Sequence, residues 1–430
     1  MSQTEVAIIL LVGSFLLFII GRLPIAIALG TSAMITVLYL GFPVRVVVQS
    51  MVSGINKVAL LAIPFFIFAG QIMSDGGISN RLVSLSKVIV GRFRGGLAMV
   101  NILTSMFFGG ISGSSVADTS SIGTILIPEM VKDGYDADFS ASVTITSSIQ
   151  GILIPPSHNM IIYSMAAGGL SVGALFMAGV VPGILLGISQ MILSYSIAVK
   201  RGYPKGDKIG VRAALKISRE AFLGLLTPVI IIGGVLGGIF TATESAAVAA
   251  LWAFIVTMFI YKEIDFKKFK QILMSTLMTL VVVMPVIAAA NAFGYLLAYL
   301  KVPQLVLDGL LGITSNKYLL LLLVNVILLI LGMIMDMAPL ILICTPVFLP
   351  LVQTLGMSPI HFGIIMLLNL GIGLLTPPVG VTLFVGSTIS KVSIEKLFKS
   401  TLPFYVSMIV LLLLMTYIEP IVMWLPRLVM

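Results

Sequence analysis

The stretch Gly-Ile-Leu-Ile-Pro-Pro at residues 151–156 recurs as Gly-Leu-Leu-Thr-Pro-Pro at residues 373–378, 222 residues further along the chain. Gly110 and Gly332 match at the same offset. Proline lacks the N–H that a helix needs and clashes with the preceding turn, so each Pro-Pro pair predicts a broken helix. Duplicated, broken apolar helices are typical of secondary transporters whose binding site lies between the breaks.

The composition is that of a membrane protein. Of the 430 residues, 59% are hydrophobic and only 10% are charged, and the mean hydropathy is +1.18. A soluble protein carries about 25% charged residues. Apolar runs long enough to cross a bilayer recur from end to end. The sequence therefore predicts an all-α polytopic membrane protein in a lipid bilayer and excludes a soluble one.

The net charge of +9 does not indicate a nucleic-acid partner. The basic residues lie in short segments between the apolar runs, as the positive-inside rule expects of cytoplasmic loops. Catalytic signals are lacking as well, because there is no phosphate-binding Gly-x-x-x-x-Gly-Lys-Ser/Thr loop and no spacing of cysteines and histidines for a metal. We expect no enzyme and no cofactor, and a cycle driven by an ion gradient or by a partner. The single cysteine, Cys344, excludes an internal disulfide.

Hydropathy places single spans at 3–20, 23–41, 58–74, 139–167, 174–199, 220–240, 242–261, 271–300, 360–388 and 400–425. Two longer apolar segments, 97–131 and 318–355, break around Gly109–Ser115 and around Gly332–Pro339. We interpret both as re-entrant hairpins, each followed by a span that breaks at Pro-Pro. Non-helical backbone at membrane depth is tolerated only inside protein or beside water, so these breaks are expected to face an interior site.

The charges and the number of crossings predict an inverted repeat. With these spans, the basic segments 75–96, 200–219, 262–270 and 391–399 all fall on one side, which is expected to be cytoplasmic. An odd number of crossings separates the two hairpins, so the first enters from the cytoplasm and the second from outside. Segment 42–57 is a candidate interfacial helix, and segment 301–317 is an amphipathic connector.

Polar residues gather near both hairpin tips and both Pro-Pro breaks. Hydroxyls and carboxylates are costly in a membrane unless they meet a ligand or each other. Such oxygens, with carbonyls freed by proline, suit Na⁺, while helix N-termini suit an anionic group. We assign Na⁺ binding, as the only metal, to Ser112, Ser114, Ser115, Asp118, Pro155, Gly332, Asp336, Thr376 and Pro377. We assign substrate contact to Thr119, Ser157, His158, Asn159, Asn369, Gly380 and Thr382.

These residues also have structural interpretations. Small hydroxylated residues line tight helix packing in membranes. Asp118 and Asp336 are suited to cap helices at the hairpin tips. His158 is suited to proton transfer or to a packing hydrogen bond as well as to substrate contact. Glu244 is expected at a solvated turn or helix start.

The motifs Gly109–Asp118, Ile154–Ser157 with Ile161–Tyr163, and Leu375–Gly380 resemble the large membrane subunit of tripartite ATP-independent periplasmic (TRAP) transporters, and the resemblance covers essentially the whole chain. It implies a Na⁺-driven elevator importer of a carboxylate solute in the bacterial inner membrane. Its partners would be a small Q-type membrane subunit and a periplasmic substrate-binding protein. The resemblance implies scaffold helices over 1–74 and 168–270, transport-domain repeats over 75–167 and 271–390, and a C-terminal helix over 391–430.

The solute is expected to be sialic acid. The stretch Pro156–Tyr163 is similar to that of sialic-acid members, whereas dicarboxylate members carry an apolar residue or proline in place of His158-Asn159. C4-dicarboxylates and sugar acids are the alternatives for the solute. A stand-alone Na⁺/anion symporter of the same architecture is the alternative for the assembly. An ion channel or a membrane-embedded enzyme fits two unlike hairpins in opposite orientation less well.

Overall fold

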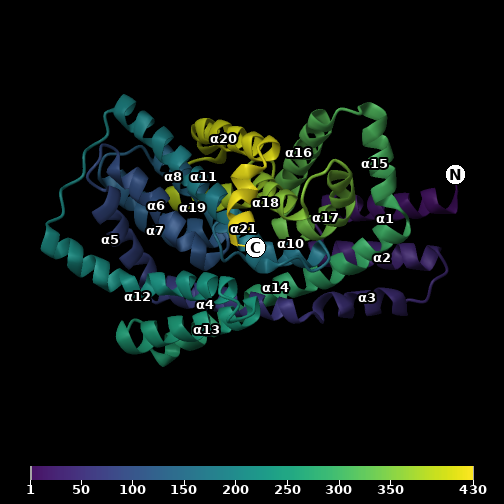
Figure 1. The fold of residues 1–430 in the computed structure, drawn as a ribbon, viewed down its shortest axis with the longest axis horizontal. Helices are drawn as coiled ribbons and strands as arrows, with labels where there is room; N and C mark the ends of the chain where they lie inside the picture. The colour runs from purple at the N-terminus through teal and green to yellow at the C-terminus, as the bar shows by residue number, and fades with distance from the viewer. Residues whose placement is uncertain (1, 430) are drawn as a thin grey trace.

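The computed structural model describes residues 2–429, and this part of the chain is helical without a β-strand (Figure 1). Nine of its helical segments are long and apolar enough to cross a membrane, which confirms the predicted all-α polytopic fold. The elements are α1 (Gln3–Ile20), α2 (Ile25–Tyr39), α3 (Arg45–Ile55), η1 (Val58–Leu61), α4 (Ala62–Asp75), α5 (Ile78–Val90), α6 (Gly96–Ser112), α7 (Ser115–Lys132), α8 (Ala137–Ser147), α9 (Gln150–Leu153), α10 (His158–Ala166), α11 (Val172–Arg201), α12 (Val211–Leu236), α13 (Ala242–Ile255), η2 (Val256–Ile260), α14 (Phe266–Tyr299), α15 (Val302–Ile313), α16 (Lys317–Ile334), α17 (Met337–Thr354), α18 (Pro359–Leu374), α19 (Val381–Ser390), α20 (Ile394–Tyr417) and α21 (Pro420–Val429).

The helix boundaries repeat with the offset seen in the sequence. Helices α7 and α17 begin and end 222 residues apart, and the starts of α8 and α18 and of α11 and α20 follow the same offset. Upstream, α5 corresponds closely to α15, and α3 with α4 corresponds to the single long helix α14. The repeat therefore extends well beyond the two hairpins. It gives each hairpin and each broken helix a counterpart in the other half of the chain.

The two repeats are interlocked at the centre of the molecule. Hairpin 1 (α6 and α7) and hairpin 2 (α16 and α17) lie on either side of the two broken helices, α8–α10 and α18–α19 (Figure 1). The second helix of each hairpin packs against the last part of the other repeat's broken helix, so α7 contacts α19 and α17 contacts α10. This crossed packing fits the inverted repeat and places both hairpin tips near both breaks.

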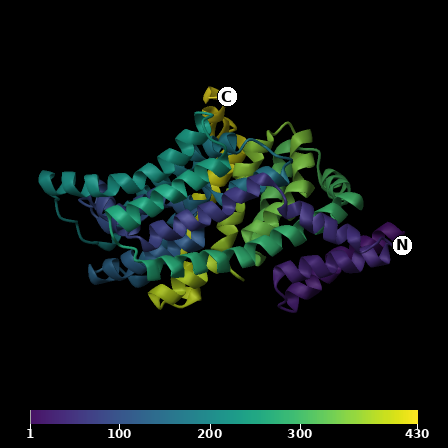
Figure 2. The same cartoon turned by 90° about the horizontal axis from the view of Figure 1, so that it is seen from below.

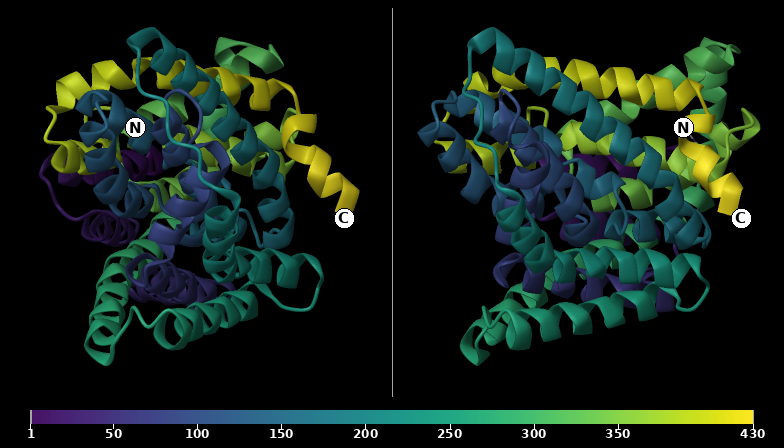
Figure 3. Two further views of the ribbon diagram at one scale, coloured as in Figure 1. Left: turned by 90° about the vertical axis from the view of Figure 1, so that its left-hand side faces the viewer. Right: turned by 60° about the vertical axis from the view of Figure 1, so that its left-hand side comes forward.

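Six helices, α2, α3, α4, α12, α13 and α14, form a band along one side of this core. Figures 2 and 3 show α12, α13 and α14 running along that side, and the contacts link them to α2, α3 and α4. Helix α14 also packs on α17 and α4 packs on α6, so the band meets both hairpins. The predicted interfacial segment 42–57 contains α3, and the predicted connector 301–317 contains α15. Glu244 sits in a capping box with Thr241 at the start of α13, as expected of a helix start.

The hairpin breaks are narrower than the sequence predicted. Helix α6 continues to Ser112, and α16 continues past Gly332 to Ile334. Gly109 and Gly332, which were expected in the breaks, lie inside helices. Because they lack a side chain, the neighbouring backbone can approach them closely. A Cβ on Gly109 would lie 2.8 Å from the Gly151 backbone, and a Cβ on Gly373 would lie 2.5 Å from the Gly332 backbone. Each hairpin therefore meets its own broken helix at a glycine contact, and the glycines on the broken helices, Gly151 and Gly373, correspond in the repeat.

The predicted C-terminal helix over 391–430 is two helices. Helix α20 ends at Tyr417, and α21 begins at Pro420. Ile418, at the end of α20, leaves the helical region, with φ −114° and ψ 80°. Pro420 then begins α21, a position that suits proline because the first N–H groups of a helix have no partner within it. The predicted span 400–425 therefore ends earlier than expected.

The contact between Gly332 and Gly373 gives a first prediction. Replacing Gly373 with Ala should force α16 and α18 apart, because the added Cβ meets backbone and not a movable side chain. Overpacking of this kind costs about 1–3 kcal/mol. We expect a lower melting temperature for purified Gly373→Ala protein. Gly233→Ala in α12 is the matched control, since its Cβ meets nothing within 4 Å. Equal melting temperatures for the two variants would contradict the close contact.

A polar cluster outside the spans joins the start of α8 to the end of α11. Asp136 Oδ2 accepts hydrogen bonds from the Tyr203 hydroxyl at 2.6 Å and from Arg201 Nη1 at 2.7 Å. The Tyr203 hydrogen bond, and after it the Arg201 guanidinium, holds the pKa of the Asp136 carboxyl below its ordinary value of 3.8. A carboxyl whose pKa is lowered by folding stabilises the folded state above its unfolded pKa. This stabilisation is lost as the pH falls through the lowered pKa.

The second prediction concerns this carboxyl. Asp136→Asn should lower the melting temperature at neutral pH, with a loss below about 1 kcal/mol because the pair is largely exposed and screened. The difference from wild type should shrink as the pH falls below 3.8, where the native carboxyl takes up its proton. Thermal unfolding between neutral and acidic pH measures this, with Asp138→Asn as a control of the same charge change. A difference that stays constant with pH would contradict the assignment.

Candidate functional site

The tip of hairpin 1 is a tight turn between two helices. Gly113 ends α6 with φ 63°, a left-handed conformation that glycine adopts without strain. Ser114 caps α7, and its hydroxyl accepts a hydrogen bond from the Ala117 N–H. The capping interpretation of Asp118 is therefore wrong, because Ser114 has that role and Asp118 lies one turn into the helix. Capping leaves the Ser115 and Asp118 side chains free to turn towards the neighbouring helices.

Three hydroxyls join the two repeats just beyond this tip. Ser115 Oγ lies 2.6 Å from Ser148 Oγ and 3.2 Å from Thr382 Oγ1, and all three residues are buried. Ser115 belongs to hairpin 1, Ser148 follows α8, and Thr382 lies in α19 of the other repeat. We name Ser115, Ser148 and Thr382 the hydroxyl cluster. It joins a predicted Na⁺ ligand to a predicted substrate ligand 267 positions away in the chain.

Further oxygens surround the first break. A Cβ on Gly151 would lie 3.4 Å from Ser112 Oγ and 3.5 Å from the Ser114 carbonyl oxygen. A Cβ on Gly110 would lie 3.1 Å from the Pro155 carbonyl oxygen. The predicted Na⁺ ligands Ser112, Ser114 and Pro155 therefore lie around one point where α6 meets α9. Both Pro155-Pro156 and Pro377-Pro378 are cis peptide bonds.

The second break repeats this arrangement with fewer hydroxyls. The Val379 N–H donates to the Met333 carbonyl at 3.1 Å, which joins the break to the tip of hairpin 2. A Cβ on Gly380 would lie 3.3 Å from the Thr376 carbonyl oxygen. Gly332 and Pro377 lie beside these residues. Asp336 occupies the N-cap position of α17, but its side chain is exposed and makes no capping hydrogen bond.

Several predicted site residues carry buried polar atoms without a partner among residues 2–429. These atoms are both carboxylate oxygens of Asp118, Thr119 Oγ1, Ser157 Oγ and His158 Nδ1. The Asn159 side-chain amide donates to the Gly113 carbonyl, at a long 3.4 Å. A buried polar group without a partner is costly, and such groups in folded proteins mark places where a ligand, an ion or water binds. The unpartnered atoms lie on both sides of the first tip and break.

Asn369 lies in a different environment from the other predicted ligands. Its Nδ2 donates to Asn325 Oδ1 at 2.8 Å, and Asn325 Nδ2 donates to Thr416 Oγ1 at 3.0 Å. These hydrogen bonds join α18 to α16 and α20. The structure therefore places Asn369 in a packing network and does not bring it to the hydroxyl cluster. Its Oδ1 atom nevertheless lacks a partner in the described part of the chain.

The polar run in α8 and α9 was missed in the sequence. Residues 144–150 read Thr-Ile-Thr-Ser-Ser-Ile-Gln within an apolar span, and this density was the available signal. Thr144 accepts from Asn101 at 2.7 Å and Ser147 lies 2.9 Å from Ser105, so the run fastens hairpin 1 to its broken helix. Ser148 completes the hydroxyl cluster. Hydroxyls and carbonyls gathered without a lysine or arginine suit a hard cation, and the start of α10 beside them suits a carboxylate.

Comparison with known proteins identifies the family. The family model described as "Tripartite ATP-independent periplasmic transporter, DctM component" matches residues 12–421. The isethionate TRAP transporter permease protein DctMQ of Oleidesulfovibrio alaskensis is 40% identical over 96% of this chain and 65% of its own length. The sialic acid TRAP transporter large permease protein SiaM of Vibrio cholerae is 40% identical, over 88% and 89%. The C4-dicarboxylate large permease DctM of Vibrio cholerae is 39% identical, over 95% and 94%.

A solved structure supports the fold independently. The YdaH transporter of Alcanivorax borkumensis aligns with a TM-score of 0.61 over 88% of both chains, at 15% sequence identity. At that identity the likeness shows the fold alone. The family model and the three relatives each cover most of this chain. The chain belongs to the DctM family, the large permease component of TRAP transporters.

Proposed function

We propose that this chain is the permease of a Na⁺-coupled importer of a carboxylate solute. The observation that carries the proposal is the hydroxyl cluster, in which Ser115 of one repeat contacts Thr382 of the other at 3.2 Å. A ligand or ion that binds there contacts both repeats at once. Its binding energy therefore favours the closed arrangement of tip and break over an open one. Coupling requires such a preference, because ion and solute must stabilise the same loaded state.

Two Na⁺ sites are proposed at corresponding places of the repeat. The first takes Ser112, Ser114 and Pro155, with Ser115 adjacent. The second takes Gly332, Thr376 and Pro377. Asp118 and Asp336 would supply negative charge near the respective ions. Support comes from the oxygens that converge at each break and from the two unpartnered carboxylate oxygens of Asp118.

The solute carboxylate is proposed to bind between the two sites. Ser157, His158 and Asn159 at the start of α10 would receive it, together with Thr119, Gly380 and Thr382. Asn369 would act only indirectly, through its packing on α16. Sialic acid (N-acetylneuraminate) is the best candidate because of the Pro156–Tyr163 stretch. The relatives are named for a sulfonate, a sugar acid and C4-dicarboxylates at nearly equal identity, so overall identity does not decide the solute.

The remaining parts of the proposal follow from the family. The loaded hairpins and broken helices would move as one body across the scaffold in an elevator mechanism. A small membrane subunit would pack on the scaffold, and a periplasmic binding protein would deliver the solute across the bacterial inner membrane. The band of α2, α3, α4, α12 and α13 supports the division into a core and a scaffold. Helix α14, which was expected in the transport domain, packs on α2, α3 and α4 and would belong to the scaffold. A stand-alone symporter is the second candidate, and the requirement for the binding protein separates the two.

The third prediction tests the ion site. Uptake of labelled sialic acid would be measured in proteoliposomes that hold the chain with its small subunit, binding protein and an inward Na⁺ gradient. Ser112→Ala, Ser114→Ala, Asp118→Asn, Asp336→Asn and Thr376→Ala are each expected to raise the Na⁺ concentration for half-maximal uptake about tenfold. A tenfold change is about 1.4 kcal/mol, the scale of one lost hydrogen bond to a charge. Thr388→Ala, exposed in the same helix as Thr382, is the matched control. Unchanged Na⁺ dependence in all five variants would refute the site.

The fourth prediction tests the assembly and the solute. With the Na⁺ gradient in place, omission of the binding protein should abolish uptake, because the permease would meet free solute only at low affinity. Uptake that persists without the binding protein would favour the stand-alone symporter. Uptake of a C4-dicarboxylate with its own binding protein, and none of sialic acid, would keep the mechanism and replace the solute.

A further inference from the structure

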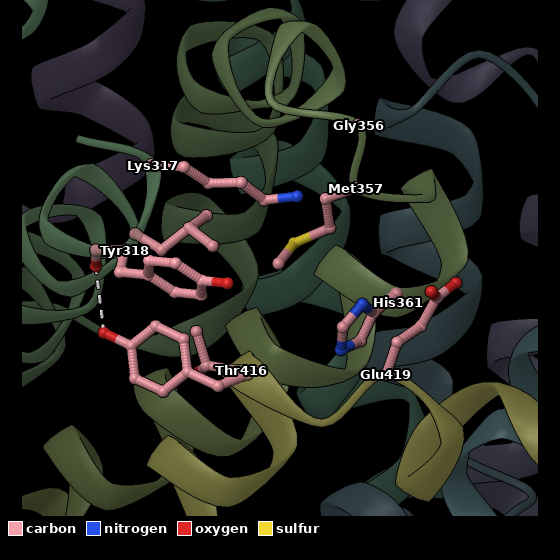
Figure 4. Close-up of a pocket in the computed structure, with 9 residues that line it drawn as sticks. Lys317, Tyr318, Gly356, Met357, His361, Thr416 and Glu419 are labelled. Carbon is pink, nitrogen blue, oxygen red and sulfur yellow. Dashed lines mark hydrogen bonds between the residues drawn. The ribbon is translucent and has the colours of Figure 1, made fainter. Parts of the chain in front are cut away.

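A cavity of about 150 Å³ lies at one end of the second repeat, away from the two Pro-Pro breaks. It is bounded by the start of α16, the turn between α17 and α18, and the junction of α20 with α21. Figure 4 shows Lys317 extending across the cavity towards Met357, with His361 on the opposite wall. The Glu419 carboxylate lies beyond the His361 ring, on the far side from Lys317. No residue proposed for Na⁺ or for the solute lines it.

The corresponding place in the first repeat is filled. At the offset of 222 residues, Met357 and His361 correspond to Tyr135 and Phe139. Those two rings pack with Tyr203, at centroid distances of 4.5 Å from Tyr135 and 5.2 Å from Phe139. All three aromatic residues are buried. The aromatic side chains therefore close in repeat 1 the space that is open in repeat 2.

Two differences create the cavity in repeat 2. Met357 and His361 fill less space than Tyr135 and Phe139. The segment after α20 turns away into α21, so nothing takes the place of Tyr203. The turns themselves match, because the corresponding residues Gly134 and Gly356 both have positive φ, at 91° and 77°. Lys317 Nζ lies 4.0 Å from the position of a Cβ on Gly356, so the ammonium group lies beside this turn.

His361 presents one ring nitrogen to this cavity. The residue is only 3% exposed, and its Nε2 lies 2.7 Å from the Met415 carbonyl oxygen. A carbonyl only accepts, so Nε2 carries a proton in either charge state. Nδ1 forms no hydrogen bond within residues 2–429. It is therefore an acceptor when the ring is neutral and a donor when the ring is protonated.

The charge around the cavity favours an anion. Glu419 is paired with Arg427 at 2.7 Å, and Lys317 has no acidic partner in the described part of the chain. The volume is below the roughly 300–1,000 Å³ of sites that enclose a whole small molecule. The space accordingly suits a carboxylate group with few attached atoms, in reach of an ammonium and an imidazolium.

We propose that this cavity is a carboxylate-binding site in which Lys317 and protonated His361 are the charged donors. The carboxylate belongs to a free small acid or to an acidic side chain of a protein partner, and the chemistry of recognition is the same. The charged groups that face His361 are Glu419, Arg427 and Lys317. A bound carboxylate favours the imidazolium form, so binding takes up a proton and strengthens as the pH falls.

Acetate is the probe for the test. Binding of acetate to the full chain in lipid nanodiscs would be followed by saturation-transfer NMR of its methyl group. We expect saturable binding that strengthens from neutral to mildly acidic pH. Lys317→Met should weaken it at least about tenfold, since a charge-assisted hydrogen bond is lost. Lys399→Met, an exposed lysine elsewhere on α20, is the matched control and should bind as wild type does.

Two further variants distinguish the effect of the His361 charge from the effect of the cavity volume. His361→Gln should abolish the pH dependence while leaving weaker binding. The double variant Met357→Tyr with His361→Phe places in repeat 2 the residue types found at the corresponding positions of repeat 1. It should remove binding because the larger side chains fill the cavity. Melting temperatures confirm that each variant is folded. No saturable binding to wild type, or equal binding to Lys317→Met and Lys399→Met, would overturn the proposal.

A last arm identifies the source of the carboxylate. The affinity of the periplasmic binding protein for the membrane complex would be measured with and without saturating acetate. Competition in wild type, absent in Lys317→Met, assigns the cavity to an acidic side chain of that partner. Docking that is indifferent to acetate assigns it to a free acid. The acetate measurement requires no transport, so failure of this site is distinguishable from failure of the proposed importer.

Discussion

The structure depends on one constraint, which is that backbone without a helical partner must be hidden from lipid. Two hairpin tips and two Pro-Pro breaks leave N–H and C=O groups unpaired at membrane depth. The chain hides them by bringing tip and break together, as the Val379 N–H does with the Met333 carbonyl. Polar atoms excluded from lipid in this way converge on a few points. The same packing that pairs the backbone thus gathers the polar atoms that we propose as sites for an ion and an anion.

The duplication also brings the tips and breaks of the two repeats into contact with each other. Because α7 packs on α19 and α17 on α10, the second helix of each hairpin contacts the broken helix of the other repeat. The hydroxyl cluster joins the repeats with hydrogen bonds, whereas the corresponding positions in repeat 2 are Met337, Leu370 and Met160. The two halves are therefore alike in backbone and different in chemistry.

Much of the fold was predictable from the sequence because its causes are local. Proline pairs, long apolar runs and the repeat offset located the breaks, the spans and the inversion. The exact ends of the breaks were not predictable, since Gly109 and Gly332 look like breakers and act as contact points between helices. Of the site, the clusters at residues 112–119 and 155–159 were located, but Ser148 became visible only through its distance to Ser115. The hydrogen bond of Asn369 to Asn325 was not predictable, because a polar residue in a span signals burial without indicating its partner. The division of the C-terminal segment followed from Pro420, a signal present in the sequence and overlooked.

We propose that the paired tips and breaks bind Na⁺ in the absence of solute and partner proteins. Thermal unfolding of the purified chain in increasing NaCl, against equal concentrations of KCl, tests it most directly. A ligand that binds only the folded state stabilises by RT ln(1 + [L]/Kd), or about 2.7 kcal/mol at one hundred times Kd. If these sites bind Na⁺, the melting temperature should rise with the concentration of Na⁺ and not of K⁺. The rise should be smaller in Asp118→Asn. The same melting curve in both salts would contradict it.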